Sequence, residues 1–282
     1  MKKKIFTLQQ IYKEGILCLE EAGIEEAKLD AWYLLEYVTG IGRAAYYGRP
    51  DRVIEEEMVR KYMETIRIRS TRVPLQHITG EQVFMGYPFL VNEHVLIPRQ
   101  DTESLVEEAL KVTTAGMQVL DMCTGSGCIL LSMMKKKPGM KGIGCDISKE
   151  ALKVAEENAK RLKVETVFVE SDLFENVTGK FDVIVSNPPY IRTDVIAGLQ
   201  DEVKLYDPFL ALDGKEDGLY FYRKIICEST AYMKNSGVLL FEIGSDQGEA
   251  VSDLMNAAGY QNVTVKKDLA GLDRVVIGMY NI

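Results

Sequence analysis

The sequence contains little histidine and has no cysteine pair at metal-ligand spacing. Its 282 residues include only two histidines, and the five cysteines form no Cys-x-x-Cys pair. A zinc site would have few ligands to draw on, and an odd number of cysteines is typical of reduced thiols rather than of a disulfide framework. We therefore predict that the protein binds no metal and that its cysteines are mostly small core residues.

Long apolar runs and an excess of positive charge are also absent. No apolar run approaches the roughly 18 to 20 residues that a membrane span needs, and the first residues are not followed by an apolar signal core. The formal net charge is −8, which gives no general attraction to nucleic-acid phosphates. These features predict a cytoplasmic protein that acts on a protein or small molecule, with neither a membrane nor a specific nucleic acid as partner.

The residues that are present follow a helical pattern first and then an alternation of strand and helix. Apolar residues recur at helical spacing up to about Ser70, which predicts a small all-helical domain over residues 1–73. Residues 74–98 carry β-branched and aromatic side chains around a turn at residues 85–88 and predict a β-hairpin linker. Residues 99–282 alternate strand and helix patterns, which predicts an α/β domain with a mostly parallel sheet covered by helices on both faces.

Closely spaced glycines follow the first predicted strand of the α/β domain. This strand, residues 117–122, runs into Cys123-Thr-Gly-Ser-Gly, and a helix begins after Gly127. In a doubly wound sheet ligands bind at such a junction, and glycines allow the backbone to approach them closely. A triphosphate is not favoured because the P-loop lysine is absent, and Leu130 replaces the third glycine of the dinucleotide-binding motif.

Acidic residues at the ends of the next two strands narrow the choice of ligand. Asp146 ends the strand of residues 141–146 and can accept hydrogen bonds from both ribose hydroxyls, or it can serve only as a cap for the following helix. Asp172 follows the third strand and could accept from an adenine amino group, with Leu173 covering the ring. An adenosine that carries methionine instead of phosphates fits this pattern, because methionine needs amides and a carboxylate partner rather than a lysine.

The motif Asn187-Pro188-Pro189-Tyr190 follows the fourth predicted strand. The prolines stiffen the loop and remove two donors, so the Asn187 side-chain oxygen and the Pro188 carbonyl remain as acceptors for one NH2 group. Such acceptors stabilise the positive charge that develops on a planar nitrogen when it attacks a sulfonium methyl, and Tyr190 would pack flat on the substrate. The alternative is a rigid turn without function, but a position beside the glycine turn favours N-methyl transfer.

Along nearly its whole length the sequence resembles the release-factor glutamine methyltransferases, the HemK type of class I methyltransferases. The matching segments are residues 74–81, 84–91, 95–103, the glycine turn, 187–191 and 207–214. The resemblance implies a helical domain that helps dock the release factor, a hairpin linker and a Rossmann-like seven-stranded sheet whose last strand is antiparallel. It also implies S-adenosylmethionine as cofactor and the glutamine of the Gly-Gly-Gln motif in peptide-chain release factors as substrate.

The motifs and the resemblance together define an expected site. The cofactor residues are predicted to be Asp121, Cys123, Thr124, Gly125, Ser126, Gly127, Asp146, Ile147, Asp172, Leu173 and Asn187. The substrate residues are predicted to be Asn187, Pro188, Pro189, Tyr190, Arg99 and Glu103, with Asn187, Pro188 and Tyr190 catalytic. Cys123 stands at the first glycine of the usual turn, so its backbone must avoid a positive φ or tolerate strain.

Two other functions fit part of the pattern. The same acceptors suit the exocyclic amine of a flipped adenine in an adenine-N6 DNA methyltransferase, although the chain has no inserted target-recognition domain and is acidic. A nucleotide-dependent oxidoreductase or a non-catalytic Rossmann-like binding module would also use such a sheet. The missing third glycine of the dinucleotide-binding motif argues against the oxidoreductase and the binding module.

Overall fold

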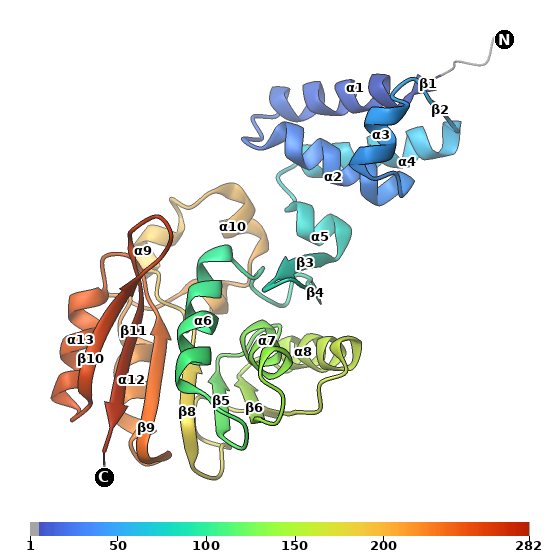
Figure 1. Ribbon diagram of the computed structural model, residues 1–282. Coiled ribbons are helices and arrows are strands. Elements are labelled where there is room, and N and C mark those ends of the chain that lie inside the picture. The colour runs from blue at the N-terminus through green and yellow to red at the C-terminus, as the bar shows by residue number, and fades with distance from the viewer. Residues whose placement is uncertain (1–5, 282) are drawn as a thin grey trace. The chain divides into compact units, whose positions relative to one another are not determined.

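A computed structural model describes residues 6–281, and it divides the chain between Gly80 and Glu81 (Figure 1). The first unit covers residues 1–80 and the second residues 81–282. This division falls inside the segment of residues 74–98 that was expected to form a separate linker. The boundaries 1–73, 74–98 and 99–282 therefore remain a proposal.

Five helices build the described part of the first unit, residues 6–80. Its helices are α1 (Leu8–Glu21), α2 (Ala27–Thr39), α3 (Arg43–Gly48), α4 (Glu56–Ser70) and α5 (Leu75–Thr79), and β1 (Phe6–Thr7) pairs with β2 (Val53–Ile54). Thr7 and Gln10 form a capping box that starts α1, and Gly40 ends α2 in the left-handed conformation. The helical character of this unit agrees with the sequence pattern, whereas α3 and the short strand pair were not anticipated.

One buried ion pair and one buried tyrosine connect the helices of the first unit. Arg69 Nε donates to Asp30 Oδ2 at 2.7 Å, which joins α4 to α2. The Tyr62 hydroxyl donates to the carbonyl of Ala31 at 3.2 Å, and its ring is fully buried. Helix α4 begins at Glu56, and Ile54 before it belongs to β2.

Seven strands form the sheet of the second unit within its described residues, 81–281. In chain order they are β5 (Gln118–Met122), β6 (Lys141–Asp146), β7 (Val167–Glu170), β8 (Phe181–Ser186), β9 (Met233–Glu242), β10 (Gln261–Lys267) and β11 (Asp273–Tyr280). Their order across the sheet is β10-β11-β9-β8-β5-β6-β7, and β11 runs antiparallel to both of its neighbours. Strand β5 pairs with β6 on one side and with β8 on the other, so the direction in which successive strands are added to the sheet reverses at β5. This reversal creates a switch point at the carboxyl end of β5.

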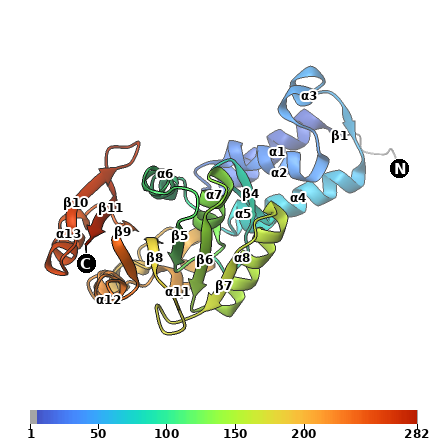
Figure 2. The same ribbon diagram turned by 60° about the horizontal axis from the view of Figure 1, so that its bottom comes forward.

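Helices cover both faces of this sheet (Figure 2). Val119 and Val183 pack with α6 (Glu103–Val112), α7 (Cys128–Lys136) and α8 (Lys149–Leu162). Their neighbours Leu120 and Ile184 face α12 (Tyr220–Ser229) and α13 (Gly248–Ala257). Successive strand residues point to opposite faces, so a continuous apolar run is buried on both sides. Every helix within residues 6–281 is too short or too polar to span a bilayer.

The predicted hairpin is present and is part of the core of the second unit. Strands β3 (Glu81–Phe84) and β4 (Tyr87–Leu90) are joined by Met85 and Gly86, whose φ angles of 52° and 85° suit a tight hairpin turn. Phe84 and Phe89 are buried in the cluster that contains α6 and α7. The expected strand character does not extend to Ile78, which lies in α5.

Short helices complete the second unit around the ends of the strands. They are the 3-10 turn η1 (Gln100–Thr102) before α6, and α9 (Thr193–Ile196), α10 (Asp201–Tyr206) and α11 (Phe209–Leu212) between β8 and α12. Ile191 and Asp213 form a parallel bridge, and the Gly214 N–H donates to the carbonyl of Ile191 at 2.7 Å. A Cβ on Gly214 would lie 2.7 Å from the backbone of Tyr190, so only glycine permits this approach.

Asn158 on α8 connects the hairpin with the glycine turn, and its replacement tests the importance of that connection. Its side chain is fully buried, accepts from Leu90 N at 2.7 Å, and donates to the carbonyls of Leu90 (3.1 Å) and Ser126 (3.0 Å). We expect Asn158→Ala to lower the free energy of unfolding by about 2 to 4 kcal/mol, because buried backbone groups lose their partners. Urea denaturation measures this loss.

The exposed Asn256 on α13 provides the matched control. Asn256→Ala is expected to change stability by no more than about 0.5 kcal/mol. Equal effects of the two substitutions would contradict a structural role for the Asn158 hydrogen bonds.

Candidate functional site

The carboxyl ends of four parallel strands meet in one row at the edge of the sheet. Met122 pairs with both Cys145 and Ser186, and Ser186 pairs with Phe241. The next residue on each strand therefore falls in the same row, which brings together Cys123, Asp146, Asn187 and Glu242. This is the edge at which doubly wound sheets bind ligands.

A cavity opens at this edge, and most of the predicted site residues line it. The wall is formed by the glycine turn, the ends of β6, β7 and β8, residues 94–102 and α11. The predicted residues that line it are Arg99, Cys123, Thr124, Gly125, Ser126, Asp146, Ile147, Asp172, Leu173, Asn187 and Pro189. The predicted residues Glu103, Asp121, Gly127, Pro188 and Tyr190 are not part of the wall, and each has another place in the structure.

The backbone of the glycine turn curves through three residues with positive φ. Cys123, Gly125 and Gly127 have φ values of 60°, 53° and 78°. Cys123 therefore tolerates the left-handed conformation rather than avoiding it, at a cost of about 1 kcal/mol or more. No atom lies within 4 Å of a Cβ built on Gly125, so the space beside this residue is open to a ligand. Gly127 instead caps α7 and packs close to Leu131.

Asp121 stabilises the glycine turn through side-chain hydrogen bonds. It is completely buried, and its Oδ2 accepts from the Thr124 hydroxyl at 2.6 Å and from Leu130 N at 3.3 Å. Burial raises the pKa of its carboxyl group to about 7, although the two hydrogen bonds act in the opposite direction. The structure therefore places Asp121 where it holds the turn and the start of α7, rather than in the cavity wall.

Asp146 presents its carboxylate to the cavity. Its Oδ2 accepts from Gly125 N and its Oδ1 from Ser148 N, both at 2.9 Å, and burial raises the pKa of the group. The cap of α8 is Ser148, whose hydroxyl accepts from Ala151 N at 3.2 Å. Asp146 is therefore not the helix cap, and each of its oxygens keeps a further lone pair for a ligand hydroxyl.

The turn after β7 contributes one apolar and one acidic residue. Leu173 is buried with a positive φ of 50°, and its carbonyl accepts from the Ser171 hydroxyl at 2.7 Å. Asp172 is exposed and lines the same cavity. This pair can cover a flat ring with a hydrocarbon side chain and accept from a group on the edge of the ring.

Asn187 has one fixed end and one open end. Its Nδ2 donates to Thr102 Oγ1 at 3.4 Å, while its Oδ1 receives no hydrogen bond from another described residue. Within residues 6–281 the carbonyl of Pro188 is likewise the acceptor of no backbone hydrogen bond. Asn187 Oδ1 thus remains available to a donor on a ligand in the cavity, whereas Pro188 is not part of the cavity wall.

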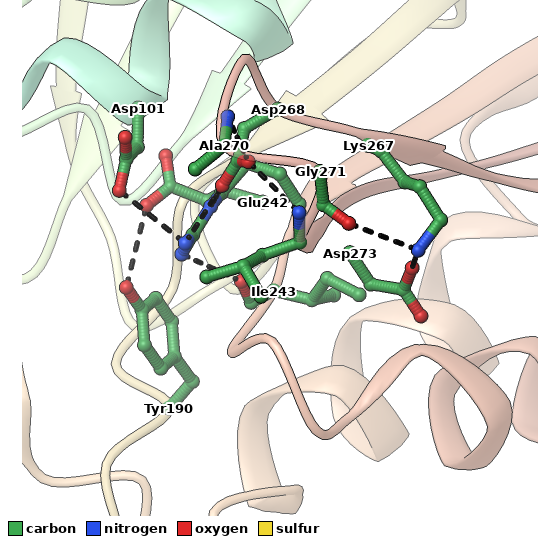
Figure 3. A network of polar contacts seen from close by, with 11 residues as sticks. Asp101, Tyr190, Glu242, Ile243, Lys267, Asp268, Ala270, Gly271 and Asp273 are labelled. Carbon is green, nitrogen blue, oxygen red and sulfur yellow. Dashed lines mark hydrogen bonds and ion pairs between the residues drawn. The ribbon is translucent and has the colours of Figure 1, made fainter.

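Tyr190 is held from both ends. Its hydroxyl donates to Glu242 Oε1 at 3.4 Å (Figure 3), and its carbonyl accepts from Gln247 Nε2 at 3.1 Å. Burial and the nearby Glu242 raise the pKa of its phenol. The sequence alone predicted only the contact of the ring with the substrate and did not anticipate the buried hydroxyl.

Arg99 and Glu103 are placed differently from each other. Arg99 lines the cavity and donates through Nη2 to Asp207 Oδ2 at 2.6 Å, which ties the segment before α6 to the segment before α11. Glu103 Oε1 accepts from Met85 N at 2.5 Å, so its carboxylate supports the hairpin turn. A direct contact of Glu103 with substrate finds no support in this geometry.

Sequence reasoning missed three polar residues at the site. Thr102 lines the cavity, and Glu242 and Arg274 lie behind the Asn-Pro-Pro-Tyr motif. A signal for Glu242 was present in the sequence, because an acidic residue ends the apolar strand β9 as Asp146 ends β6. Arg274 offered no local signal for the site, since its contact with Asp101 joins segments far apart in the chain.

Comparison with known proteins places these features in a family. The model described as "PrmC N-terminal domain" matches residues 10–80, and the model described as "Methyltransferase small domain" matches residues 100–204. The chain is 40% identical over 268 residues to the release factor glutamine methyltransferase of Caulobacter vibrioides, and the match covers 93% of both chains. It is 38% identical to the Geobacter sulfurreducens protein of the same name, with 98% of both covered.

The chain belongs to the release factor glutamine methyltransferase family. This membership confirms the predicted family, its activity as a methyltransferase, and its S-adenosylmethionine cofactor. A crystal structure of a methyltransferase from Pyrococcus furiosus is similar in fold, with a TM-score of 0.53 at 18% identity over 69% of this chain and 89% of that chain. The predicted class I fold with a helical N-terminal domain is thereby confirmed.

Metal ligands are not grouped in the described part of this release factor glutamine methyltransferase. Within residues 6–281 no cluster of three His, Cys, Asp or Glu side chains could hold a metal ion. The cysteines of the same region, which include Cys123, Cys128 and Cys145 around the cavity, are all free thiols. Burial raises the pKa of the Cys128 thiol to about 12, so it stays protonated near neutral pH.

The position of Asp146 in this methyltransferase generates a prediction about cofactor affinity. We expect Asp146→Asn to raise the Kd for S-adenosylhomocysteine about 10- to 100-fold, because an amide offers one acceptor fewer to the ribose hydroxyls. Calorimetry measures this change.

Asp182 is the matched control, because it also accepts from a backbone N–H (Gln118 N, 2.7 Å) but lies near the start of β8. Asp182→Asn should leave the Kd unchanged. An unaltered Kd in Asp146→Asn would show that Asp146 does not contact the cofactor.

Proposed function

We propose that the protein transfers a methyl group from S-adenosylmethionine to the side-chain amide nitrogen (N5) of the glutamine in the Gly-Gly-Gln motif of peptide-chain release factors. Membership in the release factor glutamine methyltransferase family supports the substrate. The observation that carries the chemistry is the position of Asn187. It follows β8 in the same row as Cys123 and Asp146, with Oδ1 open to a ligand.

The residues of the cavity fit S-adenosylmethionine. Beside Gly125 there is open space where a Cβ would stand, which suits a ligand lying against the backbone. Asp146 supplies two carboxylate oxygens for ribose, and Leu173 supplies an apolar cover for the adenine ring. The predicted cofactor residues are therefore proposed to act as a group, with Asp121 and Gly127 supporting the turn instead of contacting the ligand. When bound, the cofactor supplies an electrophilic methyl group on a sulfonium centre.

The protein has to activate a poor nucleophile. The lone pair of an amide nitrogen is delocalised into the carbonyl group, and positive charge builds on nitrogen as it attacks. Asn187 Oδ1 and the Pro188 carbonyl accept hydrogen bonds from the two N–H groups and stabilise that charge more strongly in the transition state than in the ground state. Pro189 keeps the loop rigid, so the acceptors need little rearrangement. No strong base is required, because the proton can leave after methyl transfer.

We propose that the remaining predicted residues bind the substrate of the same reaction. The ring of Tyr190 packs against the flat amide of the glutamine, and Arg99, which lines the cavity, contacts the peptide around it. Residues 1–73 form a docking domain for the release factor. We further propose a cytoplasmic location, with neither a membrane nor a specific nucleic acid as partner, which agrees with the net charge of −8.

Replacement of Asn187 tests the proposed chemistry. Asn187→Ala should lower kcat for release-factor methylation about 10²- to 10³-fold, the usual effect of removing one transition-state acceptor, while binding of S-adenosylhomocysteine is largely kept. Mass spectrometry of the release factor after incubation with enzyme and cofactor locates and counts the added methyl groups.

Two controls make the result specific. A release factor whose Gly-Gly-Gln glutamine is replaced should accept no methyl group, and Asn256→Ala should methylate at the parent rate. Near-normal turnover in Asn187→Ala would disprove the role of Asn187. Transfer of labelled methyl to DNA but not to a release factor would establish the adenine-N6 alternative.

A further inference from the structure

Two buried residues connect the two polar side chains of the Asn-Pro-Pro-Tyr motif with each other. We propose that Thr102 and Glu242 are positioning residues that fix the orientation of Asn187 and Tyr190 for methyl transfer. This inference rests on the proposed function, because it concerns the same reaction. Neither residue is part of the motif, and they lie 140 positions apart in the chain (242 − 102).

Glu242 lies directly behind the motif. It is the last residue of β9, and the pairing of Ser186 with Phe241 brings it into register with Asn187. Its side chain is 2% exposed, and its Oε1 accepts from the Tyr190 hydroxyl at 3.4 Å. Figure 3 shows the Tyr190 hydroxyl pointing at this carboxyl group.

Thr102 extends the connection to Asn187. Its side chain is 2% exposed, it lies close enough to Glu242 to lower the pKa of that carboxyl group, and its Oγ1 accepts from Asn187 Nδ2 at 3.4 Å. A hydroxyl has one hydrogen to donate. When that hydrogen points at the carboxylate of Glu242, only lone pairs face Asn187, and these select the NH2 end of its amide. Asn187 Oδ1 is then the end left for the substrate, as the proposed reaction requires.

The charge of Glu242 decides whether this arrangement holds. Burial raises the pKa of its carboxyl to about 7, while Thr102, Arg274 and Tyr190 lower it. An ionised carboxylate accepts from both Thr102 and Tyr190, whereas a protonated one has a hydrogen of its own to donate and competes with them. The titratable or charged groups that act on Glu242 or are acted on by it are Arg274, Asp101, Tyr190, Tyr222 and Cys128.

Arg274 is fixed by a second set of acidic groups. Its Nη2 lies 3.3 Å from Asp101 Oδ2 and 3.1 Å from Asp268 Oδ2, and its Nη1 donates to the carbonyl of Ile243 at 3.3 Å. Its positive charge is therefore kept close to Glu242. The cation favours the ionised carboxylate without replacing the hydroxyl donors.

Stability alone gives a poor reason for an acid at this position. Glu242 Oε2 is buried and makes no hydrogen bond within the described part of the chain. A buried charged group with an unused oxygen lowers the stability of the fold, and such costs concentrate at functional sites. The carboxyl group is better explained by the two hydroxyls that it orients.

The experiment compares Thr102→Val, which keeps the shape but removes the hydroxyl, with Thr102→Ser, which restores it. We expect Thr102→Val to lower kcat on the release factor about 10- to 100-fold, with KM and the Kd for S-adenosylhomocysteine changed by no more than about threefold. Thr102→Ser should return kcat to within about threefold of the parent. Thr113→Val is the matched control, because Thr113 is also fully buried but donates to Ala109 at the end of α6.

Glu242→Gln provides a second, independent readout. In the parent enzyme kcat should rise with pH through about 7 as Glu242 ionises. Glu242→Gln should be less active and should lack this rise, since its amide does not titrate. The double variant of Glu242→Gln and Thr102→Val should have a kcat no lower than that of the less active single variant, because both changes act on the same set of contacts.

Three outcomes would overturn the proposal. They are a parent-like kcat in folded Thr102→Val, a failure of Thr102→Ser to recover activity, and an unchanged pH profile in Glu242→Gln. A parent enzyme that fails to methylate a release factor would instead defeat the proposed function. Failure of this inference and failure of the proposed function are therefore distinguishable, because the three outcomes above are measured against a parent enzyme that is active.

Discussion

The parallel pairing of β5 with β6 on one side and β8 on the other is the constraint on which the site depends. Parallel strands place their carboxyl ends at the same edge, so the residues that follow them meet whatever their distance in the chain. Cys123, Asp146, Asn187 and Glu242 share one row for this reason. The cofactor residues and the acceptor for the substrate are therefore neighbours by backbone register, before any side chain is considered.

Groups that lower stability gather at this edge. Asp121 and Glu242 are both buried acids whose pKa values burial raises to about 7, and Cys123 has a positive φ of 60°. Each of these features is costly for folding and each touches the turn or the motif. Because these groups lie together at one edge of the sheet, we infer that the fixed dipoles and acceptors around the reacting nitrogen lower the stability of the fold.

Rigidity is supplied from outside the sheet. Asn158 connects the glycine turn with the hairpin, and Arg99 connects the segment before α6 with Asp207. Gly214 lets the loop after Asn187 to Tyr190 pack against the backbone that precedes α12. Apart from Arg99, which is also proposed to contact the substrate, these residues have no part in the chemistry.

The sequence by itself determined the family, the α/β sheet, the helical first unit and the two motifs, because apolar periodicity and glycine or proline spacing are local signals. It also indicated Asp146 and Asn187, which end or follow strands. Only the tertiary structure separated Asp121 and Glu103, which support turns, from the residues that line the cavity. It alone revealed Thr102, Glu242 and Arg274, because contacts between separate segments, such as Thr102 with Asn187 and Arg274 with Asp101, leave no trace in local sequence.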